Sequence, residues 1–379
     1  MGPIERLECF TLIHTFSPAR GPSIALGSTS AYVVVKLTDT DGVAGWGETY
    51  LVPGAAATIE EMGSIVVGRQ AGDATALRIE VSRAAQNPYL ESALSIAVDD
   101  LRARQLGVPI YDLYGGAQRS RVRAYAAMTG YIEGVDPSES WPEETAALAD
   151  EGFTAIKMRI GRYPLAHEAP LYERVRRDLP AGVDLMADGN AGFTFREAVQ
   201  TGRVLDDLGF LWFEEPLNQW DGYVGYEELA DAMDIALAGG EVTMSRGAAR
   251  SLVERRGVDI YQPEPVICGG IGEAIFIADL ARLNAISAAP HTSGGAIGIA
   301  AAIQAIATLP DPTRLPLHDL PLLEFGADRN PWKVDMFREG FVRRDGWIDI
   351  PTGPGLGFEV DEAFVRRRAS EVRVVMANS

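Results

Sequence analysis

The chain has 379 residues, of which 47% are hydrophobic and 23% are charged, a composition that excludes a disordered or fibrous protein. Its formal net charge of -19 at pH 7 excludes nucleic acid and anionic membrane surfaces as partners, because both would be repelled. The same charge means that an acidic ligand needs a local group of cations wherever it binds.

The cysteine content and the apolar segments bear on the location of the protein. Cys9 and Cys268 are too few for a disulfide framework or a structural zinc site, which indicates a reducing cytoplasm. The first ten residues are too charged for a secretory signal. The apolar stretch 294–309 contains Gln304 and is too short to span a membrane, so it predicts a buried helix. We therefore expect a cytoplasmic protein with no membrane partner, and a homo-oligomer.

The first part of the chain predicts a small α+β module, residues 1–118. A strand is expected at residues 31–37 and a second at 43–46, paired antiparallel across the turn signal Asp41-Gly42. Apolar residues then recur on one side of a helix around residues 94–101, which Gly107 would end.

Short apolar strands alternate with amphipathic helices from about residue 121, which is typical of parallel βα repeats. The expected strands are residues 122–127, 154–160, 183–187, 210–213, 235–238, 258–262, 285–289 and 315–323. Eight strands predict an α/β fold with a (β/α)7β TIM-like barrel over residues 119–325. A doubly wound sheet is the rival, but residues 126–130 lack its glycine-rich phosphate turn. Residues 326–379 are expected to pack back onto the first module, completing a capping domain.

Ionisable residues end almost every strand from the second onward, 23 to 33 residues apart. They are Lys157 with Arg159, Asp188, Glu214, Glu241, Glu264, His291 and Glu324. The C-terminal ends of barrel strands face one mouth, where active sites are assembled, so these side chains should converge. Any one of them alone would be read as a helix cap or a surface residue.

Three of these acids predict a metal site. Asp188, Glu214 and Glu241 offer hard oxygen ligands from three adjacent strands, which suits Mg²⁺. Without a metal they would form a salt-bridged cluster, for which Lys157 and Arg159 are the available cations. Asn190 and Glu215 are expected beside the metal. These two are not expected to be direct ligands.

His291 and Glu264 follow neighbouring strands, so the carboxylate is expected to orient the imidazole as a general base. The other histidines are interpreted as ordinary structural residues.

Several strand-end motifs together resemble the mandelate racemase subgroup of the enolase superfamily, over essentially the whole chain. They are Ala155-Ile-Lys157-Met-Arg159, Met186-Ala-Asp188-Gly-Asn190, Trp212-Phe-Glu214-Glu-Pro216, Gly239-Gly-Glu241, Gln262-Pro-Glu264 and Pro290-His291. Gly45-Trp-Gly-Glu48 resembles that family's capping domain. The resemblance implies that Mg²⁺, held by three carboxylates, binds a small-molecule carboxylate substrate and stabilises the enediolate formed when its α-proton leaves.

Two residues depart from that pattern. Arg159 stands where relatives commonly have a second lysine base, and arginine, with a pKa of about 12.5 or more, is a poor base. Glu264 stands where the family usually has aspartate. His291 is then the one strong base, which favours dehydration of an acid sugar over racemisation, epimerisation or lactone cycloisomerisation, in which Lys157 or Arg159 would act opposite His291.

Three further expectations complete the interpretation. Glu324 would donate a hydrogen bond to the enediolate. Arg20, in a capping loop, is a candidate for a distal group of the substrate, although a solvated loop cation is an equal reading. A barrel that has lost catalysis and only binds a metal or ligand is the non-enzymatic alternative.

Overall fold

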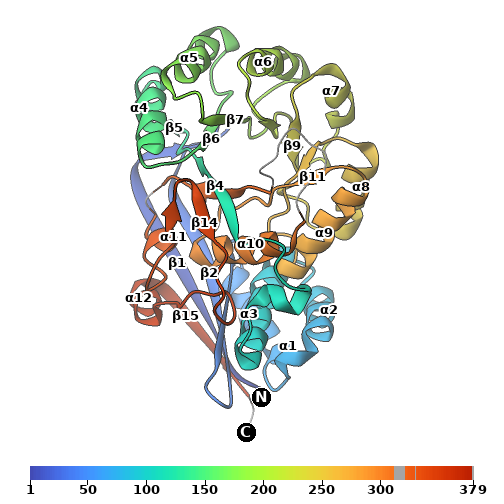
Figure 1. Ribbon diagram of the computed structural model, residues 1–379. Coiled ribbons are helices and arrows are strands. Elements are labelled where there is room, and N and C mark those ends of the chain that lie inside the picture. Colours follow the sequence, from blue (N-terminus) through green and yellow to red (C-terminus); the bar gives the residue numbers. More distant parts are fainter. Residues whose placement is uncertain (311–320, 329, 378–379) are drawn as a thin grey trace.

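The computed structural model describes residues 1–310, 321–328 and 330–377. The N-terminal module is built on an antiparallel sheet of β1 (Ile4–Gly21), β2 (Gly27–Asp39) and β3 (Ala44–Tyr50). The expected turn at Asp41-Gly42 joins β2 to β3, where Asp39 Oδ1 accepts hydrogen bonds from the backbone N–H groups of Asp41 and Val43. The last strand, β15 (Ala369–Met376), pairs with β1, so both ends of the chain lie in this sheet (Figure 1).

Three helices cover one face of the sheet: α1 (Ala55–Val66), α2 (Ala74–Ala85) and α3 (Pro88–Leu106). Helix α3 packs closely on β3 because two glycines leave room for it. A Cβ on Gly45 would lie 2.4 Å from the carbonyl oxygen of Ala97, and one on Gly47 would lie 1.9 Å from that of Ala93. As predicted, Gly107 ends α3, in the left-handed region with φ 71°.

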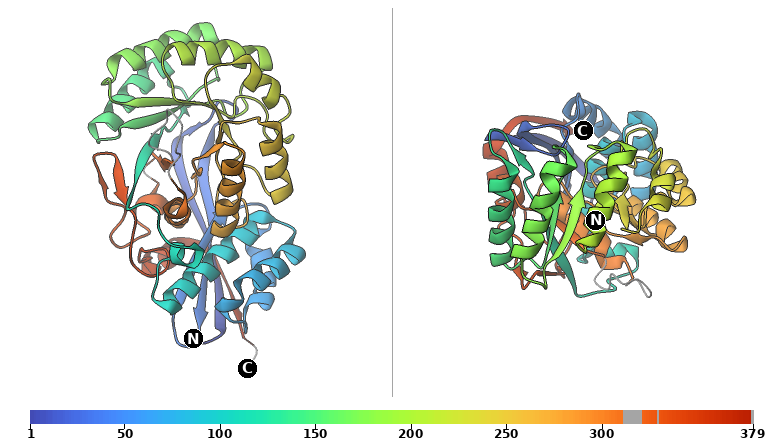
Figure 2. Two further views of the ribbon diagram at one scale, coloured as in Figure 1. Left: turned by 45° about the vertical axis from the view of Figure 1, so that its right-hand side comes forward. Right: turned by 90° about the horizontal axis from the view of Figure 1, so that it is seen from above.

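The rest of the chain forms the predicted barrel, in which seven strand–helix units precede a final strand (Figure 2). The barrel strands are β4 (Arg121–Ala127), β6 (Ala155–Arg159), β7 (Asp184–Asp188), β8 (Phe213–Glu214), β9 (Leu237–Gly239), β10 (Ile260–Tyr261), β11 (Ser287–Ala288) and β12 (Leu323–Gly326). The helices between them are α4 (Pro137–Asp150), α5 (Leu165–Asp178), α6 (Phe195–Asp207), α7 (Tyr226–Ala232), α8 (Arg246–Arg255), α9 (Ile271–Leu283) and α10 (Ala296–Thr308). Parallel pairing runs from β12 through β4 and β6 to β11.

Most of the observed strands are shorter than the expected ones, although β4 and β7 are not, and several lie further along the chain. β8, for example, begins at the last residue of the expected range 210–213 and includes Glu214. Most of the expected range 315–323 lies outside the described residues, and β12 begins at its last member. Strands β6, β7, β8 and β12 include an ionisable residue of the strand end, whereas Glu241, Glu264 and His291 follow the last residues of β9, β10 and β11.

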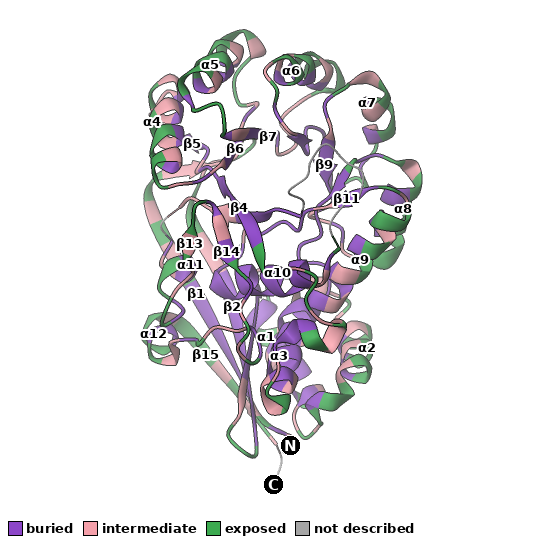
Figure 3. Ribbon diagram, in the orientation of Figure 1, coloured by how far each residue is buried: buried purple, intermediate pink, exposed green. Residues whose placement is uncertain are grey.

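One apolar side chain from each barrel strand, or from the residues directly next to it, fills the barrel interior. These are Tyr125, Ala155, Met186, Trp212, Ala238, Ile260, Ala289 and Leu322. The predicted buried helix at 294–309 is α10, which is buried over nearly its whole length (Figure 3). None of the described helices is long and apolar enough to cross a membrane.

The C-terminal segment contacts both parts of the molecule. β13 (Arg343–Arg344) pairs with β14 (Trp347–Asp349), which in turn pairs antiparallel with β4 of the barrel. The short helix α11 (Pro331–Val334) follows β12, and α12 (Glu362–Arg368) leads into β15. The small strand β5 (Tyr131–Ile132), after β4, pairs with the end of β1, which brings the cap to the barrel mouth.

Candidate active site

Polar side chains form a layer next to the apolar residues that fill the barrel interior, on the side of the C-terminal strand ends. Lys157 comes two residues after Ala155, and Glu214 comes two residues after Trp212. Side chains two apart on a strand point to the same side, so these polar groups also point into the barrel. The same spacing carries Asp188, Gln262, His291 and Glu324 inward. This alternation brings the polar side chains together at the C-terminal ends of the strands, as expected.

Lys157 lies at the centre of the layer and is fully buried. Its ammonium forms an ion pair with Glu214, lies 2.9 Å from Glu324 Oε1 and lies 3.8 Å from Asp188 Oδ2. Burial lowers the pKa of Lys157, but the carboxylates of Glu214 and Glu324 outweigh burial and raise this pKa well above its usual value. Lys157 is therefore a fixed positive charge in this arrangement.

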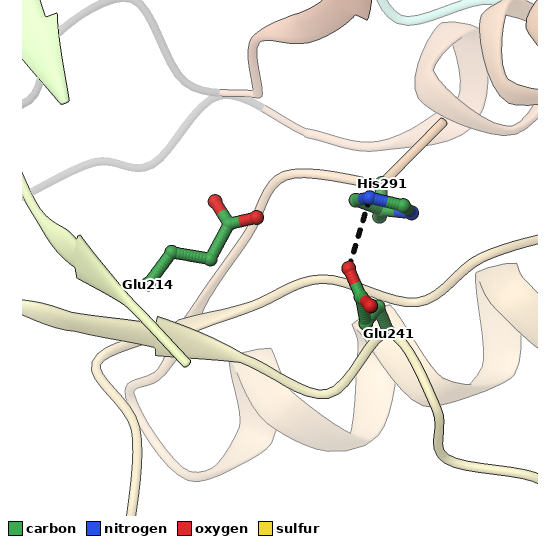
Figure 4. Close-up of side chains that lie close together, drawn as sticks. All are labelled: Glu214, Glu241 and His291. Atoms are coloured by element: carbon green, nitrogen blue, oxygen red, sulfur yellow. Dashed lines mark ion pairs between the residues drawn. The ribbon is translucent and has the colours of Figure 1, made fainter. Parts of the chain in front are cut away.

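His291 is held by carboxylates on both sides of its ring. Its Nδ1 contacts Glu264 Oε2, while its Nε2 lies 2.9 Å from Glu241 Oε2 (Figure 4) and 3.5 Å from Glu324 Oε2. Burial lowers the pKa of His291, but Glu241, Glu324 and Glu264 together raise it well above its usual value. These carboxylates favour the cationic imidazole, and the structure brings together the residues expected to be base and orienter.

Three side chains form a group that could hold a metal ion: ligand atoms of Glu214, Glu241 and His291 lie within 4.8 Å of one another (Figure 4). Asp188 is not in this group, and its backbone neighbour Asn190 donates an N–H to Asp188 Oδ1 at 3.0 Å. Two of the three expected carboxylate ligands are thus within reach of one ion, with His291 beside them.

The charge of the layer suits a divalent cation. Burial raises the pKa of Asp188, and it raises the pKa of Glu214 to about 7 even though Lys157 opposes it. In Glu324, burial also raises the pKa, but Lys157 and His291 outweigh burial and hold it at about 2. A metal ion would stabilise the ionised form of these buried carboxylates. Carboxylate oxygens and imidazole nitrogens are also common ligands of divalent ions.

Arg159 lies at the edge of the layer nearest the cap. Its guanidinium donates a hydrogen bond to Asn190 Oδ1 at 3.0 Å. Arg159, an expected cation of the site, therefore contacts Asn190, which was expected beside the metal. Glu215 points elsewhere: it accepts from the Tyr223 hydroxyl and from the backbone N–H of Gly240 at 3.1 Å. Glu215 therefore supports the turn that carries Glu241. Arg20 lies in a cavity next to Arg159.

Neutral donors in the layer were not anticipated from the sequence. Glu214 Oε2 accepts from Trp212 Nε1 at 3.0 Å and from Gln262 Nε2 at 2.7 Å, while the Tyr125 hydroxyl donates to Glu324 Oε2 at 3.0 Å. Trp212 and Gln262 lie two residues before Glu214 and Glu264, so the same alternation could have pointed to them. A search confined to ionisable residues misses them.

Comparisons with known proteins agree with this geometry. The model of the enolase C-terminal domain-like family matches residues 141–364, and that of the mandelate racemase/muconate lactonizing enzyme N-terminal domain matches residues 12–115. The chain belongs to the mandelate racemase/muconate lactonizing enzyme family of the enolase superfamily. The predicted superfamily and fold class are thereby confirmed.

Relatives within this family carry different activities. The chain is 33% identical to a D-galactarolactone cycloisomerase of Agrobacterium fabrum, over 87% of this chain and 89% of that protein. It is 30% identical to an arabinonate dehydratase of Saccharolobus solfataricus, over 71% and 69%. The crystal structure of 3,6-anhydro-D-galactonate cycloisomerase from Zobellia galactanivorans superposes with a TM-score of 0.86 at 26% identity, covering 98% of this chain and all of that one. Proteins named as dehydratases and as cycloisomerases therefore both align with most of this chain.

Proposed function

We propose that this protein is a magnesium-dependent enzyme that removes the proton next to the carboxylate of an acid sugar and then eliminates water. The observation that carries the proposal is the contact of His291 with Glu264 on one side and with the metal-binding group on the other. Dehydratases among the relatives support the reaction type.

Asp188, Glu214 and Glu241 are proposed to hold the magnesium ion, as the resemblance to the family implies. When bound, Mg²⁺ would offset the negative charge that develops on the substrate carboxylate as the α-proton leaves. Lys157 and Arg159 add fixed positive charge next to the same carboxylate, and they also overcome the repulsion from a chain of net charge -19.

His291 is proposed to move protons at Nε2. Glu264 accepts a hydrogen bond at Nδ1, which fixes the tautomer and leaves Nε2 to face the substrate. The neutral imidazole takes the α-proton at Nε2 and becomes an imidazolium, which then gives this proton to the leaving hydroxyl, so that water departs. One residue can thus act as both acid and base in an elimination.

The opposite face of the α-carbon lacks an equally good base. The ammonium of Lys157 is held by Glu214 and Glu324, and the guanidinium of Arg159 stays protonated at any physiological pH. Racemisation or epimerisation needs a base on each face, so dehydration is the better fit.

Lactone cycloisomerisation through the same enediolate is the second candidate. It is favoured by the D-galactarolactone cycloisomerase, whose sequence aligns over 87% of this chain. In this reaction Lys157 or Arg159 would act opposite His291. A barrel that only binds a metal or ligand is the non-enzymatic candidate.

The test is incubation of acid sugars and their lactones with enzyme and Mg²⁺ in deuterated water, followed by NMR and mass spectrometry. A 2-keto-3-deoxy acid with loss of water is the expected product. Exchange of the α-proton with every hydroxyl retained would reject dehydration in favour of epimerisation, and conversion of a lactone without loss of water would favour cycloisomerisation. Absence of exchange from every compound would reject enzymatic proton abstraction.

A further inference from the structure

A cavity of about 460 Å³ opens beside the polar layer, between the cap and the barrel. Arg159 and Glu324 line its inner end, so it is continuous with the proposed reaction centre. Its outer walls come from β1 and β2 of the cap and from the segment that follows β12. A volume of this size lies in the range of small-molecule sites.

Lys333, on α11, brings a buried charge to this cavity. It is 7% exposed, and its Nζ lies 2.7 Å from Asp328 Oδ1. Gly326, which also lines the cavity, makes room for the ammonium: a Cβ there would lie 2.4 Å from Lys333 Nζ. Burial lowers the pKa of Lys333, but Asp328 outweighs burial and raises it, so the group is charged.

Arg20 brings a second cation from the cap. Its guanidinium carbon lies 4.9 Å from the centroid of the Phe16 ring, which holds the side chain in place. Within residues 1–310, 321–328 and 330–377, no carboxylate forms an ion pair with Arg20, and its buried Nε has no hydrogen-bond partner. Burial raises the pKa of the neighbouring acid Glu144, and the rise is opposed by the hydrogen bond that its carboxylate accepts from the backbone N–H of Thr129 at 2.8 Å and by the charges of Arg159 and Arg20.

Among the residues that the structure describes, three cations (Arg20, Arg159 and Lys333) and two acids (Glu324 and Asp328) line the cavity. Glu324 is paired with Lys157, and Asp328 is paired with Lys333, so the two acids that line the cavity each have a cationic partner. Arg159, at the inner end, is acted on by the carboxylates of the polar layer, Asp188 and Glu324 first among them. Arg20 is therefore the lining cation without an ion pair among the described residues, and an arginine in that state is available to bind an anion.

We propose that this cavity is a subsite for a second carboxylate of the substrate, bound by Arg20 and Lys333. This inference rests on the proposed function and narrows its substrate class to dicarboxylic sugar acids. One carboxylate lies at the reaction centre with Lys157 and Arg159, and the polyhydroxylated chain runs outward to the second. Arginine is suited to bind a carboxylate in two-point fashion, and a charge-assisted bond strengthens in a buried site.

The direct test compares matched pairs of acids that differ only at the far end, such as galactarate with galactonate and glucarate with gluconate. Binding is measured by calorimetry in the presence of Mg²⁺ with the His291→Asn variant, so that turnover does not consume the ligand. In at least one pair the dicarboxylate is expected to bind at least about tenfold more tightly than its partner, because one charge-assisted contact is worth that factor.

Substitutions then test which residues cause the preference for the dicarboxylic acid. Arg20→Gln and Lys333→Met are expected to reduce the preference within each pair to about threefold or less, mostly by weakening the dicarboxylate. Gly326→Ala keeps both charges but displaces the Lys333 ammonium, so it should weaken the same ligand. Arg83→Gln, which removes one exposed arginine on α2 of the cap, is the matched control and should leave the preference unchanged. Circular dichroism verifies that each variant is folded.

Equal binding of the two acids in every pair would overturn the subsite. It would also be overturned if Arg20→Gln weakened the binding of both acids equally, or if no dicarboxylate bound. These outcomes are separate from failure of the proposed function. If monocarboxylic acids exchange their α-protons as rapidly as dicarboxylic ones in the wild-type protein, the subsite is wrong while the chemistry stands. If dicarboxylates bind with the expected preference but none exchanges, the chemistry is wrong while the subsite stands.

Discussion

Two carboxylates contact His291 from opposite edges of its ring, and they have different consequences for its chemistry. Glu264 is fully buried at Nδ1 and orients the imidazole, whereas Glu241 is the more exposed partner at Nε2, where a substrate would approach. The proton that moves in the proposed reaction is therefore the one on Nε2.

His291→Asn is expected to lower the rate of α-proton exchange by about 100- to 10,000-fold, the usual contribution of a general base. Thermal unfolding should change little, because asparagine fills much of the same space. Exchange is followed by NMR in deuterated water. Glu264→Gln is the companion variant: it keeps an acceptor for Nδ1 but removes the charge, so its loss should be smaller and its pH profile shifted. An undiminished rate in His291→Asn would show that another residue moves the proton.

At the scale of elements, Glu48 on β3 joins the cap to the barrel. Its buried carboxylate accepts a hydrogen bond from the backbone N–H of Gly295, directly before α10. A Cβ on Gly295 would lie 2.7 Å from Glu48 Oε2, which explains the glycine there. Burial raises the pKa of Glu48 from 4.5 to about 8, with the Gly295 bond opposing the rise. The cap thus inserts one titratable group under the start of a barrel helix.

This raised pKa predicts how stability changes with pH. The unfolded chain ionises Glu48 above about pH 4.5, whereas the folded chain does so only near pH 8, so this group lowers the free energy of unfolding progressively across that interval. Its share is at most about 1.4 kcal/mol per pH unit. Glu48→Gln cannot ionise, so its stability relative to wild type should improve steadily from pH 5 to pH 8. Urea denaturation at several pH values measures the difference.

Glu61→Gln is the control for this experiment, because Glu61 is exposed on α1 and its replacement removes the same formal charge. Its difference from wild type should be independent of pH. A Glu48→Gln difference that is equally independent of pH would mean that Glu48 ionises with an ordinary pKa in the folded protein.

At the scale of the whole molecule, closure of the barrel brings carboxylates from several strands close together. The inner layer of the barrel holds carboxylates that are almost fully buried, with Lys157 and Arg159 as the permanent cations expected there. Mutual repulsion among these acids opposes closure of the barrel. A divalent ion that binds only the folded state would relieve this repulsion and stabilise the closed barrel.

We therefore expect Mg²⁺ to raise the midpoint of thermal unfolding and a chelator to lower it. At a concentration one hundred times its dissociation constant, the ion would add about 2.7 kcal/mol to stability. Differential scanning calorimetry with Mg²⁺ and with EDTA measures the shift. Glu241→Gln should abolish most of it, whereas Glu61→Gln should leave it intact. Identical midpoints with Mg²⁺ and with EDTA in the wild-type protein would contradict the metal site.

The strand-end chemistry could be predicted from the sequence because it depends on local spacing. Side chains two apart on a strand share a face, so an apolar residue followed by a polar one at that distance places both inside the barrel. This relation holds for Ala155 with Lys157 and for Trp212 with Glu214. The barrel, the convergence of its polar residues and the pairing of His291 with Glu264 therefore followed from the sequence alone.

The other contacts among these groups were decided only by tertiary structure. Lys157 meets Glu324 because parallel pairing brings β12 next to β4, and β4 next to β6, across more than half of the chain. Arg20 and Lys333 come to one cavity only because the cap sheet and the segment after β12 both reach the barrel mouth. Contacts between distant segments depend on how the sheet closes and how its layers pack, and no local periodicity in the sequence encodes that geometry.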